Sequence, residues 1–317
     1  MSIEISCNEA AHRLQQAKRL VITAHINPDG DALGSALGLQ ELLHQQGKEA
    51  LVLIDDDLPK NFSFLPGYDQ VQRPEQPHYE ADLLVVLDAS LDRIGSVREK
   101  CPAPVLNIDH HVSNDGAADW LYLDARAAAT AELIFRLGCE MEVPFSAAAA
   151  EVLYTGMATD CGFFRYANTT AFTMRAAADL LEHGVKPNRI SEALEQKSYA
   201  LVKGRLKALE TMELCADGRI GGLFLDRETA DGLETTEGLI DSVRIIEGVD
   251  VAVLVKCIDD GLCRVSMRSK NTDVSRIAMA LQGGGHIRAA GCTIHSPLPE
   301  AKKIILAAIT AALEEQA

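Results

Sequence analysis

The chain has 317 residues, 47% of them hydrophobic, and is therefore long enough for two domains that each bury a core. Its 30 basic and 46 acidic residues give a formal charge of −16, which argues against broad electrostatic binding to long DNA or RNA. No apolar run reaches about 18 residues, no basic region precedes an apolar stretch at the N-terminus, and the eight cysteines form no Cys-x-x-Cys pair, so we expect a cytoplasmic protein with reduced thiols and no membrane span.

The first half of the chain alternates short apolar runs with helical periods. This pattern predicts strands near 20–25, 50–54, 82–88 and 104–108, and helices near 32–46, 127–139 and 146–158. Such alternation is typical of a parallel sheet covered by helices. Ligands of parallel sheets gather at the carboxyl ends of the strands, so a site is expected there.

The second half begins with a charged helical stretch of roughly 190–214 that lacks obvious strand signals. Beyond it the pattern predicts strands near 219–226, 250–258 and 261–268, and helices near 273–282 and 299–315. We therefore expect an α/β protein with three parts and a cleft between its two domains. The parts are a parallel-sheet domain at 1–190, a helical linker at 191–214 and a smaller α/β domain at 215–317.

Side chains that can bind metal ions follow three of the predicted strands, and a further group follows an apolar helix. The groups are His25-Ile-Asn-Pro-Asp29-Gly-Asp31, Asp88, Asp109-His110-His111 and Thr159-Asp160. Histidine nitrogen combined with several carboxylate oxygens suits a pair of divalent cations such as manganese better than a structural zinc ion. The sequence therefore predicts a metal centre at the strand ends.

Each of these groups also has an ordinary structural explanation. Asp31 could cap the helix that begins near residue 32, and Asp88 could belong to a simple turn after its strand. A lone histidine is often satisfied by backbone carbonyls. Because His110 and His111 are adjacent and project differently, we expect one to bind metal and the other to contact a substrate phosphate or orient the cluster.

Candidate anion-binding residues lie in two further segments. Arg165, in the loop after Asp160, suits a phosphate or a stacked base, unless it only packs over a neighbouring phenylalanine. The segment Gln282-Gly-Gly-Gly-His286-Ile-Arg288 offers unobstructed backbone N–H groups beside basic side chains, which is typical of an anion cradle or of a flexible glycine turn. Arg268-Ser269 ends a predicted strand and is expected to face the same cleft.

Taken together, these motifs resemble the DHH family of phosphoesterases with its DHH-associated C-terminal domain, and most closely its standalone nanoRNase/pAp phosphatase type. The first domain shows His-x-Asn-Pro-Asp-Gly-Asp, the strand-terminal Asp, Asp-His-His and Thr-Asp in the order of that family, and the second shows Gly-Gly-Gly-His-x-x-Ala-Ala-Gly. One departure is Cys161, where relatives usually carry threonine, so a role for that hydroxyl is doubtful here.

The resemblance implies a metal centre with two manganese ions, or magnesium in their place. His25 and Asp29 would bind one ion, Asp31, His110 and Asp160 the other, and Asp88 would bridge them. Asp88 and His110 would also act in catalysis together with His111, which would contact the scissile phosphate. The residues that would hold the rest of the nucleotide across the cleft are Arg165, Arg268, Ser269, Gly284, Gly285, His286 and Arg288.

The expected activity is two-metal hydrolysis, which releases 5′-mononucleotides from short oligoribonucleotides and phosphate from 3′-phosphoadenosine 5′-phosphate. Two alternatives remain open. One is a phosphodiesterase for cyclic di-AMP or its linear product pApA, because the metal site would be the same. The other is a non-catalytic nucleotide sensor. The family suggests a homodimer, and we expect neither long duplex nucleic acid nor a membrane as a partner.

Overall fold

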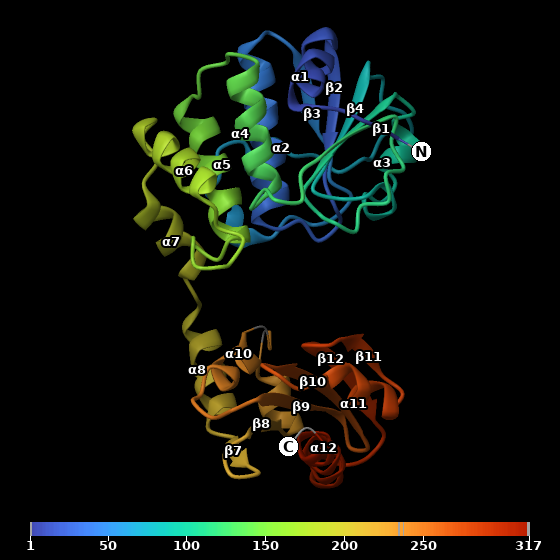
Figure 1. Cartoon of the computed structure of the whole chain (residues 1–317), viewed down its shortest axis with the longest axis vertical. Coiled ribbons are helices and arrows are strands. Elements are labelled where there is room, and N and C mark those ends of the chain that lie inside the picture. Colours follow the sequence, from blue (N-terminus) through green and yellow to red (C-terminus); the bar gives the residue numbers. More distant parts are fainter. Residues whose placement is uncertain (1, 234, 237, 316–317) are drawn as a thin grey trace. The chain divides into compact units, whose positions relative to one another are not determined.

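The computed structural model describes residues 2–233, 235–236 and 238–315 (Figure 1). The chain forms two compact units, one ending at Gln196 and the other beginning at Lys197. In the part of the chain that the structure describes, no helix is both long enough and apolar enough to cross a membrane. The two units are described separately below.

The first unit is built on a six-stranded sheet in the order β1-β6-β5-β4-β2-β3. Every neighbouring pair of strands is parallel, which confirms the predicted parallel sheet. The two short strands β1 and β6 were not predicted. The strands are β1 (Ile3–Glu4), β2 (Arg19–Thr23), β3 (Glu49–Val52), β4 (Leu83–Leu87), β5 (Val105–Asp109) and β6 (Trp120–Leu123).

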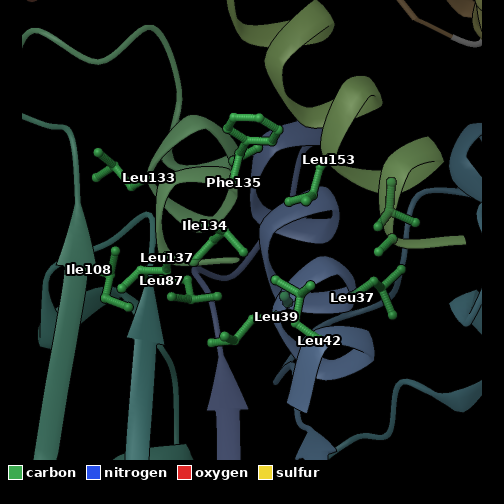
Figure 2. Packing of buried hydrophobic residues seen from close by; sticks show 14 of the residues in the cluster. Leu37, Leu39, Leu42, Leu87, Ile108, Leu133, Ile134, Phe135, Leu137 and Leu153 are labelled. Carbon is green, nitrogen blue, oxygen red and sulfur yellow. The ribbon is translucent and has the colours of Figure 1, made fainter. Parts of the chain in front are cut away.

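Both faces of this sheet are covered, because alternate residues of each strand enter different cores. Leu83, Val85 and Leu87 of β4 join the larger core on one face, whereas Leu84 and Val86 join a smaller core on the other. Figure 2 shows part of the larger core, where the strand side chains Leu87 and Ile108 lie among helix side chains such as Leu137. The helices of this unit are α1 (Cys7–Gln16), α2 (Gly30–Gln45), α3 (Val97–Lys100), α4 (Thr130–Glu140), α5 (Ala147–Asp160), α6 (Ala171–Glu182) and α7 (Pro187–Glu195), with short 3-10 turns at Lys60–Phe62, Tyr68–Gln70 and Leu91–Arg93.

The packing of α2 against α5 depends on glycines spaced four residues apart. A Cβ at Gly34 would lie 2.5 Å from the carbonyl oxygen of Val152, and one at Gly38 would lie 2.5 Å from the side chain of Leu153. The absence of side chains lets the two helices approach closely. This approach brings Asp31, in the first turn of α2, toward Asp160, the last residue of α5.

The second unit contains a mixed sheet in the order β11-β12-β10-β9-β8-β7. Its neighbours are antiparallel except for β8 and β9, which are parallel. The expectation of a second α/β unit is thus confirmed. The strands are β7 (Met212–Cys215), β8 (Ile220–Leu225), β9 (Val251–Asp259), β10 (Leu262–Ser269), β11 (Gly284–His286) and β12 (Ala289–Ile294), and the helices are α8 (Tyr199–Leu209), α9 (Arg227–Asp231), α10 (Leu239–Arg244), α11 (Val274–Ala280) and α12 (Leu298–Glu314).

The stretch near 190–214 differs in part from the charged helical stretch that the sequence suggested. It contains the end of α7, which belongs to the first unit, then α8 and the strand β7 of the second. β7 lies at the edge of its sheet and has no fully buried residue. β7 therefore lacks the alternation of buried and exposed residues from which a strand can be predicted.

Candidate metal centre and active site

The predicted ligands come together at the carboxyl ends of the strands of the first sheet. Strands β5, β4 and β2 are neighbours, and their carboxyl ends lead into Asp109-His110-His111, Asp88 and the His25 loop. The N-terminus of α2 and the C-terminus of α5 add further carboxylates. The six proposed metal ligands, His25, Asp29, Asp31, Asp88, His110 and Asp160, all take part in groups whose ligand atoms lie within 4.8 Å of one another.

Asp88 occupies the centre of this cluster. Its Oδ2 lies 3.5 Å from Nε2 of His25, and its Oδ1 lies 3.5 Å from Nε2 of His110. Nε2 of His25 also lies 3.8 Å from Oδ1 of Asp29. Nε2 of His110 also lies 3.9 Å from Oδ2 of Asp31 and 3.7 Å from Oδ2 of Asp160. One carboxylate thus faces two separate groups of ligand atoms, as a residue that bridges two ions must.

The hydrogen bonds of His25 and His110 leave the same ring nitrogen, Nε2, free to bind a metal ion. Nδ1 of His25 lies 2.8 Å from the carbonyl oxygen of Ile26, and Nδ1 of His110 lies 3.3 Å from that of Ala127. Because a carbonyl oxygen only accepts, each Nδ1 carries the proton and each Nε2 presents a lone pair toward the carboxylates. Second-sphere bonds of this kind are usual around metal-bound histidine.

The burial of the cluster shows that its donors fit divalent cations. Nε2 of His110 is buried and has no hydrogen-bond partner among the described residues. Burial, together with the charges of Asp88 and Asp160, raises the pKa of Asp31 well above its usual value. Burial also raises the pKa of Asp160 to about 6, although His110 opposes the shift. Divalent cations would bind the orphaned nitrogen and neutralise carboxylates that otherwise repel one another.

Asp31 is held in place by a helix far along the chain. Its carboxylate accepts hydrogen bonds from the backbone N–H groups of Thr130 at 2.6 Å and Ala131 at 2.8 Å. These are orphan donors of the first turn of α4. The hydroxyl of Thr130 donates to Oδ1 of Asp88 at 2.9 Å. The explanation of Asp31 as a helix cap is wrong, because Asp29 is the N-cap of α2.

His111 differs from the other two histidines. Its Nδ1 lies 2.8 Å from Oδ1 of Asp109, and its side chain is 41% exposed. The hydrogen bond that His111 donates to Asp109 is the main cause that raises the pKa of His111 above its usual value. Nδ1 also lies 3.6 Å from Oδ1 of Asp88. His111 is thus half-exposed beside Asp88, and its contact with the scissile phosphate stays a prediction.

Four of the eight non-glycine residues with positive φ in the described chain lie around the cluster. Asn27 (φ 53°), Asp88 (φ 58°), Phe163 (φ 55°) and Phe164 (φ 63°) have positive φ angles, which non-glycine residues rarely adopt. Asn27 lies in the loop after β2, Asp88 directly follows β4, and the two phenylalanines come shortly after α5. Strain of this kind persists where surrounding structure enforces it, often at functional sites.

The loop after α5 contains Cys161 and Arg165. The thiol of Cys161 is buried and donates to the carbonyl oxygen of Met157 at 2.7 Å. It is therefore engaged by its own helix. Arg165 is exposed, and its Nε donates to the carbonyl oxygen of Gly162 at 2.7 Å. Its role in binding substrate stays a prediction.

The predicted substrate residues of the second unit gather at one end of its sheet. Arg268 on β10 pairs with Ala289 on β12, which pairs with His286 on β11. Directly opposite residues of paired strands point to the same face, so Arg268 and His286 lie on one face with the small Ala289 between them. Arg288, in the turn between β11 and β12, donates to the carbonyl oxygen of Thr272 at 3.1 Å.

The central part of the glycine-rich segment is a strand, flanked by turn residues. Gly284 and Gly285 lie in β11, paired with Gly291 and Ala290 of β12. A Cβ at Gly285 would lie 2.5 Å from Cα of Ala290, so part of the glycine requirement comes from close strand packing. Ser269 is buried, and its hydroxyl donates to the carbonyl oxygen of Thr272. The anion-binding role of these residues stays a prediction.

Three residues that contribute to the site were not predicted. They are Thr130 and the two asparagines Asn107 and Asn114, which form hydrogen bonds with Asp88, Asp109 or the backbone beside them. The asparagines flank the Asp-His-His motif in the sequence, which was an available signal. Thr130 lies far from any motif, so nothing in its neighbourhood indicated a role.

Comparison with known proteins gives a consistent result over most of the chain. Residues 19–157 match the model of the DHH family, N-terminal domain, and residues 233–315 match that of the DHHA1 domain. The bifunctional oligoribonuclease and PAP phosphatase NrnA of Thermus thermophilus is 34% identical over 92% of this chain and 89% of its own length. The Bacillus subtilis protein of the same name is 30% identical over 87% of this chain and 90% of its own length.

A solved structure agrees with these matches. The exopolyphosphatase-related protein from Bacteroides fragilis superposes with a TM-score of 0.82 at 26% sequence identity, covering 96% of both chains. The fold and the sequence matches together define a phosphoesterase with a DHH catalytic unit and a DHHA1 unit. The chain belongs to the DHH family.

Proposed function

We propose that this protein hydrolyses short oligoribonucleotides to 5′-mononucleotides and removes phosphate from 3′-phosphoadenosine 5′-phosphate. The observation that carries the proposal is the position of Asp88, whose two carboxylate oxygens face His25 and His110 at 3.5 Å each. Two groups of ligand atoms that share one carboxylate can bind two divalent cations, and a two-metal site of this kind is suited to phosphate ester hydrolysis. The relatives named as bifunctional oligoribonuclease and PAP phosphatase match nearly the whole chain, which supports the choice of substrates.

Two divalent cations, which we propose to be manganese with magnesium as the alternative, fit the donor set described above. His25, Asp29 and Asp88 would hold one, and Asp88, Asp31, His110 and Asp160 the other. When bound, the ions supply positive charge that polarises a phosphoryl group and makes a water molecule more acidic. Histidine nitrogen among the donors favours manganese over magnesium.

The chain's own groups would then bind and orient the substrate. His111 is half-exposed beside Asp88, and we assign its free Nε2 to the scissile phosphate. Thr130 steadies Asp88 through its hydroxyl, and its N–H fixes Asp31. These contacts hold the ligand carboxylates in position before the ions and the substrate arrive, which lowers the cost of organising the site.

The second unit would bind the part of the nucleotide that does not react. Arg268 and His286 share one face of its sheet, and Arg288 lies in the adjoining turn. We propose that these residues and Arg165 contact the remaining phosphate and base of the nucleotide, with Ser269, Gly284 and Gly285 shaping the binding surface of the second unit. A net charge of −16 favours short substrates over long duplex nucleic acid.

We further propose that the protein acts in the cytoplasm as a homodimer and without a membrane partner. The dimer rests on the family resemblance alone. Sedimentation of the purified protein tests it directly, since a mass near twice that of the 34.2 kDa chain is expected.

Product analysis by chromatography tests the activity. Purified protein with manganese is incubated in parallel with pApA, cyclic di-AMP, 3′-phosphoadenosine 5′-phosphate and a long RNA. We expect AMP from pApA and from the bisphosphate while the long RNA survives. Asp88→Asn should abolish both reactions, whereas Asp69→Asn, which changes an exposed carboxylate of the same unit, should not.

Other outcomes of this experiment distinguish the alternatives. If cyclic di-AMP is consumed fastest, the protein is a cyclic dinucleotide phosphodiesterase. If pApA binds tightly in manganese but persists for hours, the protein is a nucleotide sensor. An Asp88→Asn protein that retains the wild-type rates would contradict the assignment of this site.

A further inference from the structure

Asp109 begins the Asp-His-His motif, yet it takes no part in the metal-binding groups found among the described residues. It is completely buried at the end of β5. Its Oδ1 accepts hydrogen bonds from the backbone N–H groups of His110 at 2.7 Å and His111 at 3.0 Å, and from the ring Nδ1 of His111 at 2.8 Å. The carboxylate therefore serves the geometry of the two histidines.

The second oxygen of Asp109 is held by Asn114. Nδ2 of Asn114 donates to Oδ2 of Asp109 at 2.6 Å and to Oδ1 of Asn107 at 2.7 Å. The other end of the Asn114 amide is also occupied, because its Oδ1 accepts from the backbone N–H of Gly116 at 2.9 Å. Asn114 is therefore fixed at both ends of its side chain.

Asn107 connects this network to the neighbouring strand. Its Nδ2 donates to the carbonyl oxygens of Val86 and Ala89, both at 2.9 Å. These two carbonyls flank Asp88, whose backbone has a φ of 58°. The strained end of β4 and the histidine pair at the end of β5 are thus joined through two buried or part-buried amides.

The donor and the acceptor of every hydrogen bond in this network follow from the bonds that Asn107 makes. Carbonyl oxygens only accept, so Asn107 must turn its NH2 toward Val86 and Ala89 and its oxygen toward Asn114. Asn114 must then donate, and the carboxylate of Asp109 accepts. The proton between Asp109 and His111 therefore belongs to Nδ1 of His111, which leaves Nε2 for the reacting group.

We propose that Asn114 is a positioning residue, which fixes the ring orientation and the tautomer of His111 through Asp109. The proposal rests on the proposed function, in which His111 meets the scissile phosphate. Outer partners that orient the ligands of a metal site typically contribute roughly 10- to 100-fold to activity, and we expect an effect of similar size for a partner that orients His111. Asn107 extends the effect by keeping the end of β4, with Asp88, at a constant distance from His111.

The first test compares the kinetics of Asn114→Ala and Asn114→Asp on 3′-phosphoadenosine 5′-phosphate with manganese. The aspartate variant keeps the volume of the side chain but presents oxygen to Asp109, so it also covers the case in which the alanine variant fails to fold. For both we expect kcat to fall roughly 10- to 100-fold. KM and the affinity for Mn²⁺ measured by calorimetry should change little, because Asn114 contacts no side chain proposed as a ligand.

The matched control is Asn8→Ala. Asn8 donates to Glu140 in the same unit, away from the strand ends, so its replacement should leave kcat unchanged.

A double-mutant cycle adds a stricter criterion. In a His111→Ala background, Asn114→Ala should have no further effect on kcat, since the residue it positions is gone. Full additivity of the two changes would overturn the proposal.

A measurement without turnover separates this inference from the proposed function. Nitrogen-15 NMR of the histidine rings, recorded at one pH and assigned with His111→Ala, should show a hydrogen-bonded Nδ1–H for His111 in the wild-type protein. That signal should shift or broaden in both Asn114 variants and remain in Asn8→Ala. If the wild-type protein cleaves none of the substrates, the proposed function fails while this test still stands. An unchanged ring signal in both Asn114 variants would refute the positioning role.

Discussion

The carboxylate of Asp31 accepts a 2.6 Å hydrogen bond from the backbone N–H of Thr130, 99 residues further along the chain. The first turn of α4 thereby neutralises part of the charge of a carboxylate that is almost completely buried. This contact and the bond from Thr130 to Asp88 join helix α4 to two groups of residues in the candidate metal centre.

Replacement of Asp31 by asparagine should abolish both metal binding and activity. The amide lacks the charge of the carboxylate, and whichever way it turns, it cannot accept from all of its present donors, the N–H groups of Thr130 and Ala131 and the hydroxyl of Ser35. Calorimetric titration with Mn²⁺ checks this prediction. Asp69→Asn is the control, and full Mn²⁺ affinity in Asp31→Asn would contradict the assignment.

Addition of Mn²⁺ should raise the free energy of unfolding of the metal-free protein. The carboxylates of Asp31, Asp88 and Asp160 repel one another, and bound cations remove that repulsion. A ligand that binds only the native state at 100 times its dissociation constant contributes about 2.7 kcal/mol. Thermal unfolding with Mn²⁺ and then with excess chelator measures the gain and its reversal. The gain should shrink in Asp160→Asn, and an equal gain in that variant would place the ion elsewhere.

Gly34→Ala should destabilise the first unit through the contact between α2 and α5. The new Cβ would lie 2.5 Å from the carbonyl oxygen of Val152, which belongs to backbone and cannot move aside cheaply. Overpacking of this kind typically costs about 1–3 kcal/mol. Urea unfolding measures the change, with the exposed Gln45→Ala on the same helix as the neutral control. A stability equal to wild type would show that the two helices can separate at little cost.

Asp124 should make the stability of the protein depend on pH in the acid range. Burial acts to raise the pKa of this carboxyl, but hydrogen bonds from Arg126 and Arg136 hold it below its usual value. A depressed pKa stabilises the folded state above the unfolded pKa of about 3.9, and this contribution is lost as the pH falls through the lower, folded pKa. Asp124→Asn should therefore lower the free energy of unfolding at pH 7, on the order of 1 kcal/mol.

The difference between wild type and Asp124→Asn should shrink as the pH falls below about 4, where the wild-type carboxyl begins to be protonated in the unfolded state. Denaturant unfolding of both proteins from pH 3 to 7 follows this difference. A difference that stays constant over the whole range would show that charge plays no part in the contribution of Asp124.

The buried parallel strands were predictable because each forms a run of apolar residues enclosed on both faces. Leu83–Leu87 became β4, and the run that ends at Asp109 became β5. The short strand β1 and the edge strand β7 lack such a pattern, whereas the apolar run Trp120–Leu123, which forms β6, was not recognised as a strand. β11 is made of Gly284, Gly285 and His286, residues whose local preference does not favour a strand, and its pairing with β12 determines its conformation.

The candidate ligands were visible in the sequence because each follows an apolar run, and parallel strands bring their carboxyl ends to one edge. Sequence alone thus determined the chemistry at this edge, histidines and carboxylates suited to divalent cations. Only the tertiary structure decided how these groups are held: Asp31 by the N–H groups of α4, and His111 by Asn114 through Asp109. The physical reason is that a hydrogen bond depends on distances of a few tenths of an ångström between groups, and the partners of Asp31 come from a distant segment of the chain.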